Sequence, residues 1–113
     1  MNVSTVNLEE GMPTVEAAKN KFNQALRTAR ASGVKVVKII HGYGSSGRGG
    51  AIKQEIARQM LLKKRLGQIK DYVSGEDFSP FNEAARNILS ACPELSRDRD
   101  YSRCNHGISL ILL

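Results

Sequence analysis

The sequence contains no apolar run of the ~20 residues that a helix needs to cross a bilayer. Its first residues, Met1-Asn2-Val3-Ser4, also lack the charged segment and following apolar stretch that mark a secretory signal. We therefore expect a cytoplasmic protein with no membrane partner. Cysteine is equally scarce: Cys92 and Cys104 are the only two, and they do not form a CxxC pair, so we expect reduced, inert thiols.

Potential metal ligands are few as well. Cys92, Cys104 and His106 could supply three, but their spacing fits no zinc pattern and a fourth ligand is missing. We predict no metal site and no cofactor, although a divalent metal stays open as an alternative that no motif indicates.

Acidic residues are outnumbered, with 11 Asp and Glu against 17 Lys and Arg, which gives a formal charge of +6 in 113 residues. Between Lys35 and Lys70 every charged residue except Glu55 is basic, whereas most acids lie outside that stretch. A chain of this length forms one domain. A basic field on so small a domain favours a polyanionic partner, although charge that serves only solubility is an equal alternative.

The apolar pattern predicts alternating strands and helices. Thr14 is a candidate N-cap for a helix that ends at Ser32-Gly33, and a second helix is expected to begin near Ala51 and end by Gly67. The expected strands cover residues 3–8, 34–40, 69–74 and 107–113, with a short helix from Ser79-Pro80 to Cys92-Pro93 and a mobile loop over residues 94–106. This order predicts an α/β fold whose mixed four-stranded sheet begins with two parallel strands.

Glycines crowd the segment between the second strand and the second helix, residues 41–50, which we call the glycine loop. Glycine permits positive φ and leaves backbone N–H groups accessible, and the following helix N-terminus favours an anion. Serine hydroxyls and the charges of Arg48 and Lys53 add phosphate donors. We therefore predict a nucleic-acid backbone site formed by His41, Gly42, Tyr43, Gly44, Ser45, Ser46, Gly47, Arg48, Gly49, Gly50 and Lys53.

Two other phosphate loops fit less well. Residues 42–47 satisfy GxGxxG, but a dinucleotide site also needs an acidic residue at the end of the next strand, where Asp71 instead lies at the start. The Walker pattern needs Lys followed by Ser or Thr after the last loop glycine, and the chain has Arg48-Gly49.

The helix from Thr14, the strand and loop from Val36 to Gly50, and the terminal Gly107-Ile108-Ser109-Leu110 together resemble the Smr domain, the small MutS-related module. The resemblance extends over most of the chain, and the His-Gly-x-Gly loop is its most specific part. It implies a two-layer βαβαββ sandwich within the single domain, residues 1–113. The chain departs from the family at about residues 78–105, where we expect an insertion that carries a short extra helix and is longer than in most members. The resemblance also implies binding to DNA or RNA, with endonuclease activity in several family members.

The first family motif, Leu-Asp-Leu-His-Gly, is altered in this chain. Asn7 replaces the Asp, and Glu9 or Glu10 replaces the His. A structure-selective endonuclease would therefore use His41 with Glu9 or Glu10, because Asn cannot act as a base. For His41 the resemblance favours direct phosphate contact, and the structural alternative is a ring that fixes the loop through a backbone carbonyl.

A different class of function also fits the basic face. The domain could be a non-catalytic interaction module that binds an acidic protein. The sequence does not distinguish DNA from RNA and does not indicate the oligomeric state.

Overall fold

The computed structural model describes residues 2–11, 13–42 and 48–113, with the backbone alone at positions 48 and 49. The strands are β1 (Val3–Asn7), β2 (Val36–Ile40), β3 (Asp71–Ser74) and β4 (Ile108–Leu112). The α-helices are α1 (Val15–Ala31), α2 (Arg48–Arg65) and α3 (Glu83–Ala91), and two 3-10 helices are η1 (Gly75–Asp77) and η2 (Pro93–Arg97).

The strands form one sheet in the order β1-β2-β4-β3. β1 and β2 are parallel, whereas β4 is antiparallel to both β2 and β3. The predicted α/β class with a mixed four-stranded sheet is therefore confirmed. The last strand lies inside the sheet, so all five residues of β4 are buried, as its continuous apolar sequence requires.

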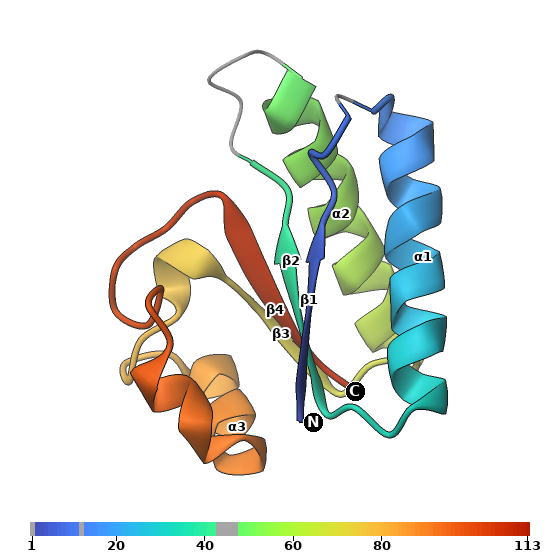
Figure 1. The fold of residues 1–113 in the computed structure, drawn as a ribbon. Helices are drawn as coiled ribbons and strands as arrows, with labels where there is room; N and C mark the ends of the chain where they lie inside the picture. The colour runs from blue at the N-terminus through green and yellow to red at the C-terminus, as the bar shows by residue number, and fades with distance from the viewer. Residues whose placement is uncertain (1, 12, 43–47) are drawn as a thin grey trace.

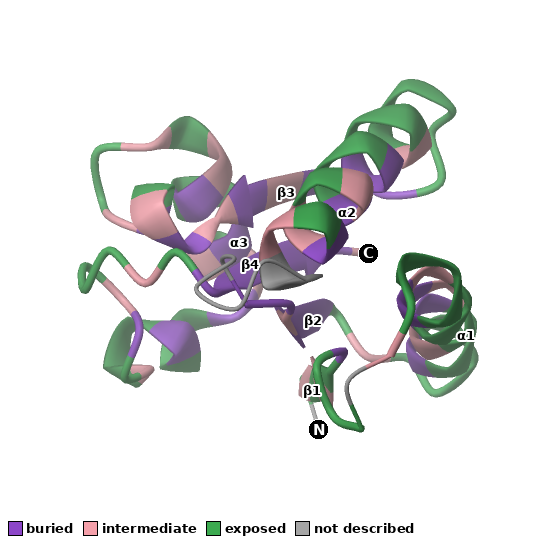
Figure 2. Ribbon diagram, turned by 90° about the horizontal axis from the view of Figure 1, so that it is seen from above, coloured by how far each residue is buried: buried purple, intermediate pink, exposed green. Residues whose placement is uncertain are grey.

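Helices cover both faces of the sheet. α1 and α2 lie side by side on one face, and α3 lies against the other (Figure 1). Alternate residues of β2 separate the two cores: Val37 and Ile39 face α1 and α2, whereas Val36 faces α3. Buried residues accordingly concentrate in the sheet and on the inward faces of the helices (Figure 2).

The caps of α1 agree with the sequence. The Thr14 side chain accepts a hydrogen bond from the Ala17 N–H at 3.0 Å, and Gly33 has a φ of 74° directly after the helix. Phe22 and Leu26, spaced four residues apart, are buried against the sheet. The inward face of α1 is thus fixed by its apolar periodicity.

Two helix starts and one loop differ most from the prediction. α2 begins at Arg48, three residues before Ala51, so its first turn contains two glycines. α3 is capped by Asn82, whose Oδ1 accepts from the Ala85 N–H at 3.0 Å, and not by Ser79. Residues 94–106, which were expected to form a mobile loop, include part of η2, and Asp98 in this segment bonds Lys38 in β2 at 2.9 Å.

No helix that the structure describes combines the length and the apolar composition needed to cross a membrane.

Candidate functional site

Four chain segments meet at one edge of the sheet, which we call the site edge. Asn7 pairs with Ile40, Ile40 with Ile108, and Ser74 with Ser109, so the ends of β1, β2 and β3 lie beside the start of β4. The segments that leave these strands include Glu9, His41 and Glu76, and His106 leads into β4. The sheet topology therefore brings together residues from four separate parts of the chain (Figure 1).

His41 is the first residue after β2, and its ring is only 1% exposed. Its Nδ1 lies 2.6 Å from the Gly42 carbonyl oxygen, to which it donates, and its Nε2 lies 2.9 Å from the Ser109 hydroxyl. Since Nδ1 carries the proton, Nε2 accepts from the Ser109 O–H. Both ring nitrogens are occupied inside the protein. The ring thus has the structural role that was given as the alternative for His41, in which it fixes the loop through a backbone carbonyl. Direct contact with a phosphate would require the ring to break these two hydrogen bonds.

Burial lowers the pKa of His41 below its ordinary value of 6.5. The hydrogen bond to the Gly42 carbonyl opposes this shift, and the nearby charge of Lys53 adds to it. His41 is therefore neutral at pH 7, in agreement with a ring that donates once and accepts once.

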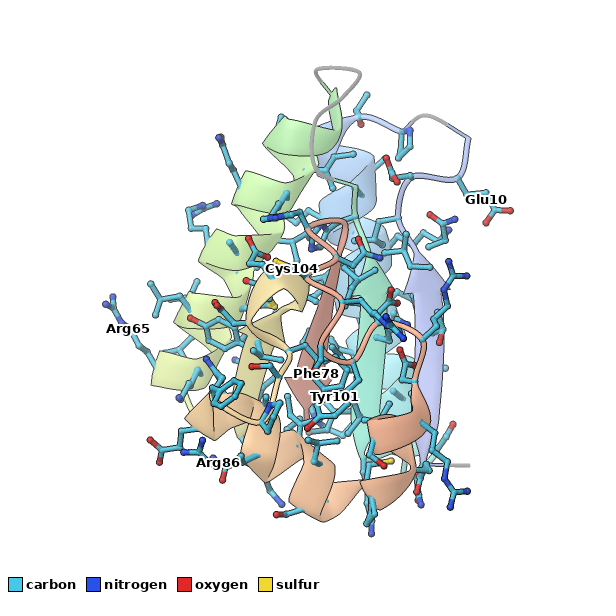
Figure 3. The ribbon with its side chains drawn as sticks, turned by 90° about the vertical axis from the view of Figure 1, so that its left-hand side faces the viewer. Glu10, Arg65, Phe78, Arg86, Tyr101 and Cys104 are labelled. Carbon is cyan, nitrogen blue, oxygen red and sulfur yellow. The ribbon has the colours of Figure 1, made fainter. Side chains whose placement is uncertain are left out.

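The carboxylate of Glu9 lies against the start of the glycine loop. Gly42 has a φ of 72°, and a Cβ at that position would overlap the Glu9 carboxylate. The Glu9 N–H donates to Asn7 Oδ1 at 2.9 Å, so the Asn7 side chain serves to hold this turn. Glu10 instead points outward into solvent (Figure 3), with its Oε2 3.8 Å from the Lys21 ammonium. Of the two acidic candidates, Glu9 is the one that lies against the described start of the glycine loop, at Gly42.

The middle of the glycine loop, Tyr43, Gly44, Ser45, Ser46 and Gly47, lies outside the described residues. The loop resumes within the first turn of α2, where Arg48, Gly49 and Gly50 have helical backbone. This turn contains no acidic residue. Its N–H groups have no carbonyl partner within the helix, and the positive end of the helix dipole lies there.

Lys53, one turn into α2, reaches across to the segments that flank β3 and β4. Its ammonium lies 3.1 Å from Glu76 Oε2 and 2.9 Å from the His106 carbonyl oxygen. His106 also places Nδ1 3.2 Å from the same Glu76 oxygen, and Cys104 Sγ lies 3.9 Å from His106 Nε2. The predicted phosphate ligand Lys53 is thus at the site edge and already paired with a carboxylate.

Glu76 remains ionised in this arrangement. Burial alone would raise the pKa of Glu76, but backbone hydrogen bonding together with Lys53 and His106 outweighs burial and holds the pKa below its ordinary value.

Sequence reasoning did not assign Glu76, His106 or Ser109 to this site, although it considered His106 as a metal ligand and Ser109 as part of the family pattern. Glu76 follows the end of β3, and the rule that ligands gather at the carboxyl ends of strands could have indicated it. No such signal exists for His106 and Ser109, because their position depends on β4 entering the sheet between β2 and β3.

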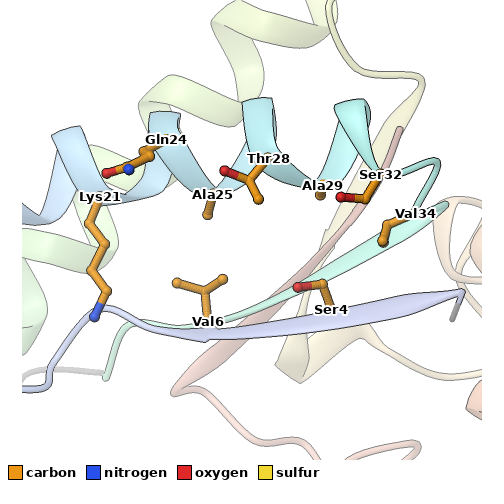
Figure 4. Close-up of a pocket in the computed structure, with 9 residues that line it drawn as sticks. All are labelled: Ser4, Val6, Lys21, Gln24, Ala25, Thr28, Ala29, Ser32 and Val34. Carbon is orange, nitrogen blue, oxygen red and sulfur yellow. The ribbon is translucent and has the colours of Figure 1, made fainter.

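Away from the site edge, a hollow of about 320 Å³ lies between the edge strand β1 and α1 (Figure 4). It contains none of the predicted site residues and no carboxylate or imidazole, since it is lined by Ser4, Val6, Lys21, Gln24, Ala25, Thr28, Ala29, Ser32 and Val34. Within the described parts of the chain, no three His, Cys, Asp or Glu side chains gather as a metal site. Both cysteines are free, and Cys92 donates to Glu94 on the α3 side of the sheet.

The model of the Smr domain family matches residues 10–78 of the chain. This chain belongs to the Smr domain family. The match begins at Glu10, after the altered positions Asn7 and Glu9, and ends at residue 78, where the expected insertion begins. It includes α1, β2, the glycine loop and α2. The family assignment made from the His-Gly-x-Gly loop is therefore confirmed, and the family is generally linked to nucleic-acid binding and nicking.

The structure is also similar to a crystal structure of the Smr domain of Thermus thermophilus MutS2. The two share 23% identity with a TM-score of 0.60, over 97% of this chain and 96% of that chain. The likeness shows that the Smr fold extends beyond residue 78 and includes β4. No curated protein sequence matches the chain at a significant level.

Proposed function

We propose that this Smr domain binds DNA or RNA through the sugar-phosphate backbone at the site edge. The observation that carries the proposal is the early start of α2, which places the backbone of Gly49 and Gly50 in a helix N-terminus free of acidic residues. The glycine loop leads directly into it, and Lys53 adds a cation one turn further on.

His41 has a positioning role in this proposal. Its bonds to the Gly42 carbonyl and to Ser109 fix the point where the glycine loop leaves the sheet. The loop backbone, Arg48 and Lys53 then contact the phosphates. Such contacts position the polymer without reading its sequence, so the proposal covers both DNA and RNA.

The test is a binding titration on both polymers over a salt series. We expect the logarithm of the affinity to fall steeply with the logarithm of the salt concentration. Replacing Arg48 and Lys53 with alanine should reduce that slope by roughly 2, about 0.9 for each phosphate contact. Lys64→Ala is the matched control, because Lys64 lies at the far end of the same helix and is likewise paired, with Asp71 at 3.0 Å. Binding that is insensitive to salt, or no binding to either polymer, would refute the proposal.

Endonuclease activity is a second candidate, and one observation favours it. The Glu9 carboxylate lies against Gly42, where it could take a proton from water or hold a divalent metal. His41 offers no free ring nitrogen for the same reaction.

Nicking of supercoiled plasmid and structured RNA, with and without divalent metal, tests this candidate. Cleavage that is lost in Glu9→Gln and kept in Glu10→Gln would establish it. Equal activity in the wild type and in Glu9→Gln would identify a contaminating nuclease.

A further inference from the structure

A second basic site lies at the opposite end of the two parallel-packed helices. A cleft of about 320 Å³ is formed where α1 and α2 approach their C-termini. We call it the basic cleft, and it is lined by Asn23, Leu26, Arg27, Arg30, Lys63 and Gln68. Since α2 runs away from the glycine loop, its last turn lies at the far edge of the sheet (Figure 1).

The cations of the basic cleft differ from four basic residues that the fold pairs with acids. Lys38, Lys53, Arg58 and Lys64 each lie within 4.0 Å of a carboxylate. Among the residues that the structure describes, Arg27, Arg30 and Lys63 have no such partner, and none of the residues that line the cleft is acidic. The cleft therefore concentrates positive charge that the fold does not neutralise.

Two of these cations are held in place. The Arg30 guanidinium donates to the Gln68 carbonyl oxygen, and the Lys63 ammonium lies 6.0 Å from the centre of the Phe22 ring. Burial lowers the pKa of Lys63, and the charges of Arg30 and Arg27 lower it further. An anion in the cleft would relieve this repulsion.

Helix dipoles explain only part of the cluster. Cations are favoured in the last turn of a helix, where Arg30 of α1 and Lys63 of α2 lie. Arg27 precedes the last turn of α1, and its position three residues before Arg30 brings two like charges to the same side of the helix. The dipoles also give no reason for both helices to direct their cations into one cleft.

We propose that the basic cleft binds a second phosphate group of the same nucleic acid that the glycine loop holds. The inference rests on the proposed function and extends the surface that contacts nucleic acid along the outer side of α1 and α2. From Arg48 to Lys63, α2 rises by about 22 Å, at about 1.5 Å per residue. B-DNA rises by about 3.4 Å per base pair, so the two sites are separated by about six to seven base pairs along its axis.

The test compares two double variants with the same loss of charge. Arg27→Gln/Lys63→Gln removes two cations from the basic cleft. Arg65→Gln/Arg86→Gln is the control, since Arg65 is exposed at the end of α2 and Arg86 lies on α3 at the other face of the sheet, both outside the cleft (Figure 3). Circular dichroism and urea midpoints confirm that each variant is folded. Arg27→Gln alone provides a milder change that should give half the effect.

Binding of a DNA hairpin with a ten-base-pair stem is then measured by fluorescence anisotropy from 50 to 200 mM salt. We expect the cleft variant to lower the salt slope by about 0.9, the value for one phosphate contact, and the affinity at 50 mM salt by about 10-fold. The control should keep the wild-type slope. On a four-base-pair stem, which cannot reach both sites, the wild type and the cleft variant should bind equally.

The outcomes separate the two proposals. If the wild type binds and the cleft variant shows the same salt slope, the proposal for the basic cleft is overturned and the glycine-loop site is unaffected. If the wild type and the cleft variant also differ in affinity for the four-base-pair stem, the two sites do not bind one nucleic acid together, because the cleft would then be an independent anion site. No binding by the wild type overturns both proposals.

Discussion

Lys38 belongs to the basic stretch of the sequence, yet the structure buries it within the fold. It lies in β2, an interior strand, and its ammonium is 2.9 Å from Asp98 Oδ1 and bonded also to Asp100. The three side chains are 8%, 19% and 9% exposed, respectively. The Asn105 amide donates to Asp100 at 2.9 Å, which completes a network between β2 and the segment that precedes β4.

Replacing Lys38 with methionine should destabilise the domain strongly. The change keeps the apolar stem and leaves two neighbouring carboxylates in a site with little water. Breaking a buried ion pair in this way costs about 3–5 kcal/mol, a large part of the total stability of about 5–15 kcal/mol. With a urea m-value of about 1.5 kcal/mol/M, the unfolding midpoint should fall by about 2–3 M.

The loss should also depend on pH. Burial alone would raise the pKa of Asp100, but the bonds from Asn105 and Lys38 outweigh it and hold the pKa below its ordinary value of 3.8. Because the folded pKa is lowered, this stabilisation is present above pH 3.8 and is lost as the pH falls through the folded pKa. The difference between wild type and Lys38→Met should therefore shrink as the solution is acidified below pH 4.

Urea unfolding at pH 7, followed by circular dichroism, measures the effect. Lys64→Met is the matched control, because Lys64 pairs with one carboxylate and is 48% exposed, so its loss should be below about 1 kcal/mol. Adding Asp98→Asn and Asp100→Asn to Lys38→Met should recover most of the stability. A loss for Lys38→Met no larger than the control would refute the reasoning.

Three further outcomes are expected. Because the pKa of His41 is lowered in the folded protein, the unfolded chain binds a proton first as the pH falls. The stabilisation from this histidine is therefore complete above pH 6.5 and declines below it. Urea titrations from pH 8 to 5 should show this decline in the wild type and not in His41→Gln. Burial and the Glu94 carboxylate raise the pKa of Cys92 to about 12, so its thiol stays protonated at pH 8. A thiol reagent at pH 8 should therefore label the native wild type once, at the exposed Cys104. The Cys104→Ser variant should not be labelled. Glu76→Gln removes a negative charge beside Lys53 and should tighten nucleic-acid binding by about 2–5-fold at low salt, whereas weaker binding would show that Glu76 positions Lys53 for the phosphate.

The sequence predicted the elements whose signals are local. Apolar spacing on α1 and the β-branched run of β2 both follow from the residues that the element itself contains. The start of α2 was misplaced because Gly49 and Gly50 are poor helix formers, yet tertiary packing of Ile52 and the residues that follow extends the helix through them.

The start of α3 shows a different difficulty. Ser79-Pro80 and Asn82 are both acceptable beginnings of a helix, and the local pattern does not rank them. In the structure Asn82 caps the helix, whereas Ser79 Oγ accepts from the Phe81 N–H at 3.3 Å in the preceding turn.

The candidate site was predictable only in part. The glycine loop is contiguous and carries its own signal, but the partners of its flanking residues come from distant segments. Ser109 lies 68 residues from His41 along the chain, and Glu76 lies 23 residues from Lys53. For the same reason the basic stretch could not be divided in advance into cations that the fold neutralises, such as Lys38, and cations that remain available, such as Lys63.

The most direct measurement maps the nucleic-acid contact onto the structure. Backbone amide shifts of the ¹⁵N-labelled domain are recorded by NMR during titration with a short DNA or RNA oligonucleotide. We predict the largest changes from Gly42 to Lys53, with changes at Glu76 and His106 and none over α3. Changes confined to residues 78–105, or no changes with either polymer, would contradict the assignment of the phosphate site to the glycine loop.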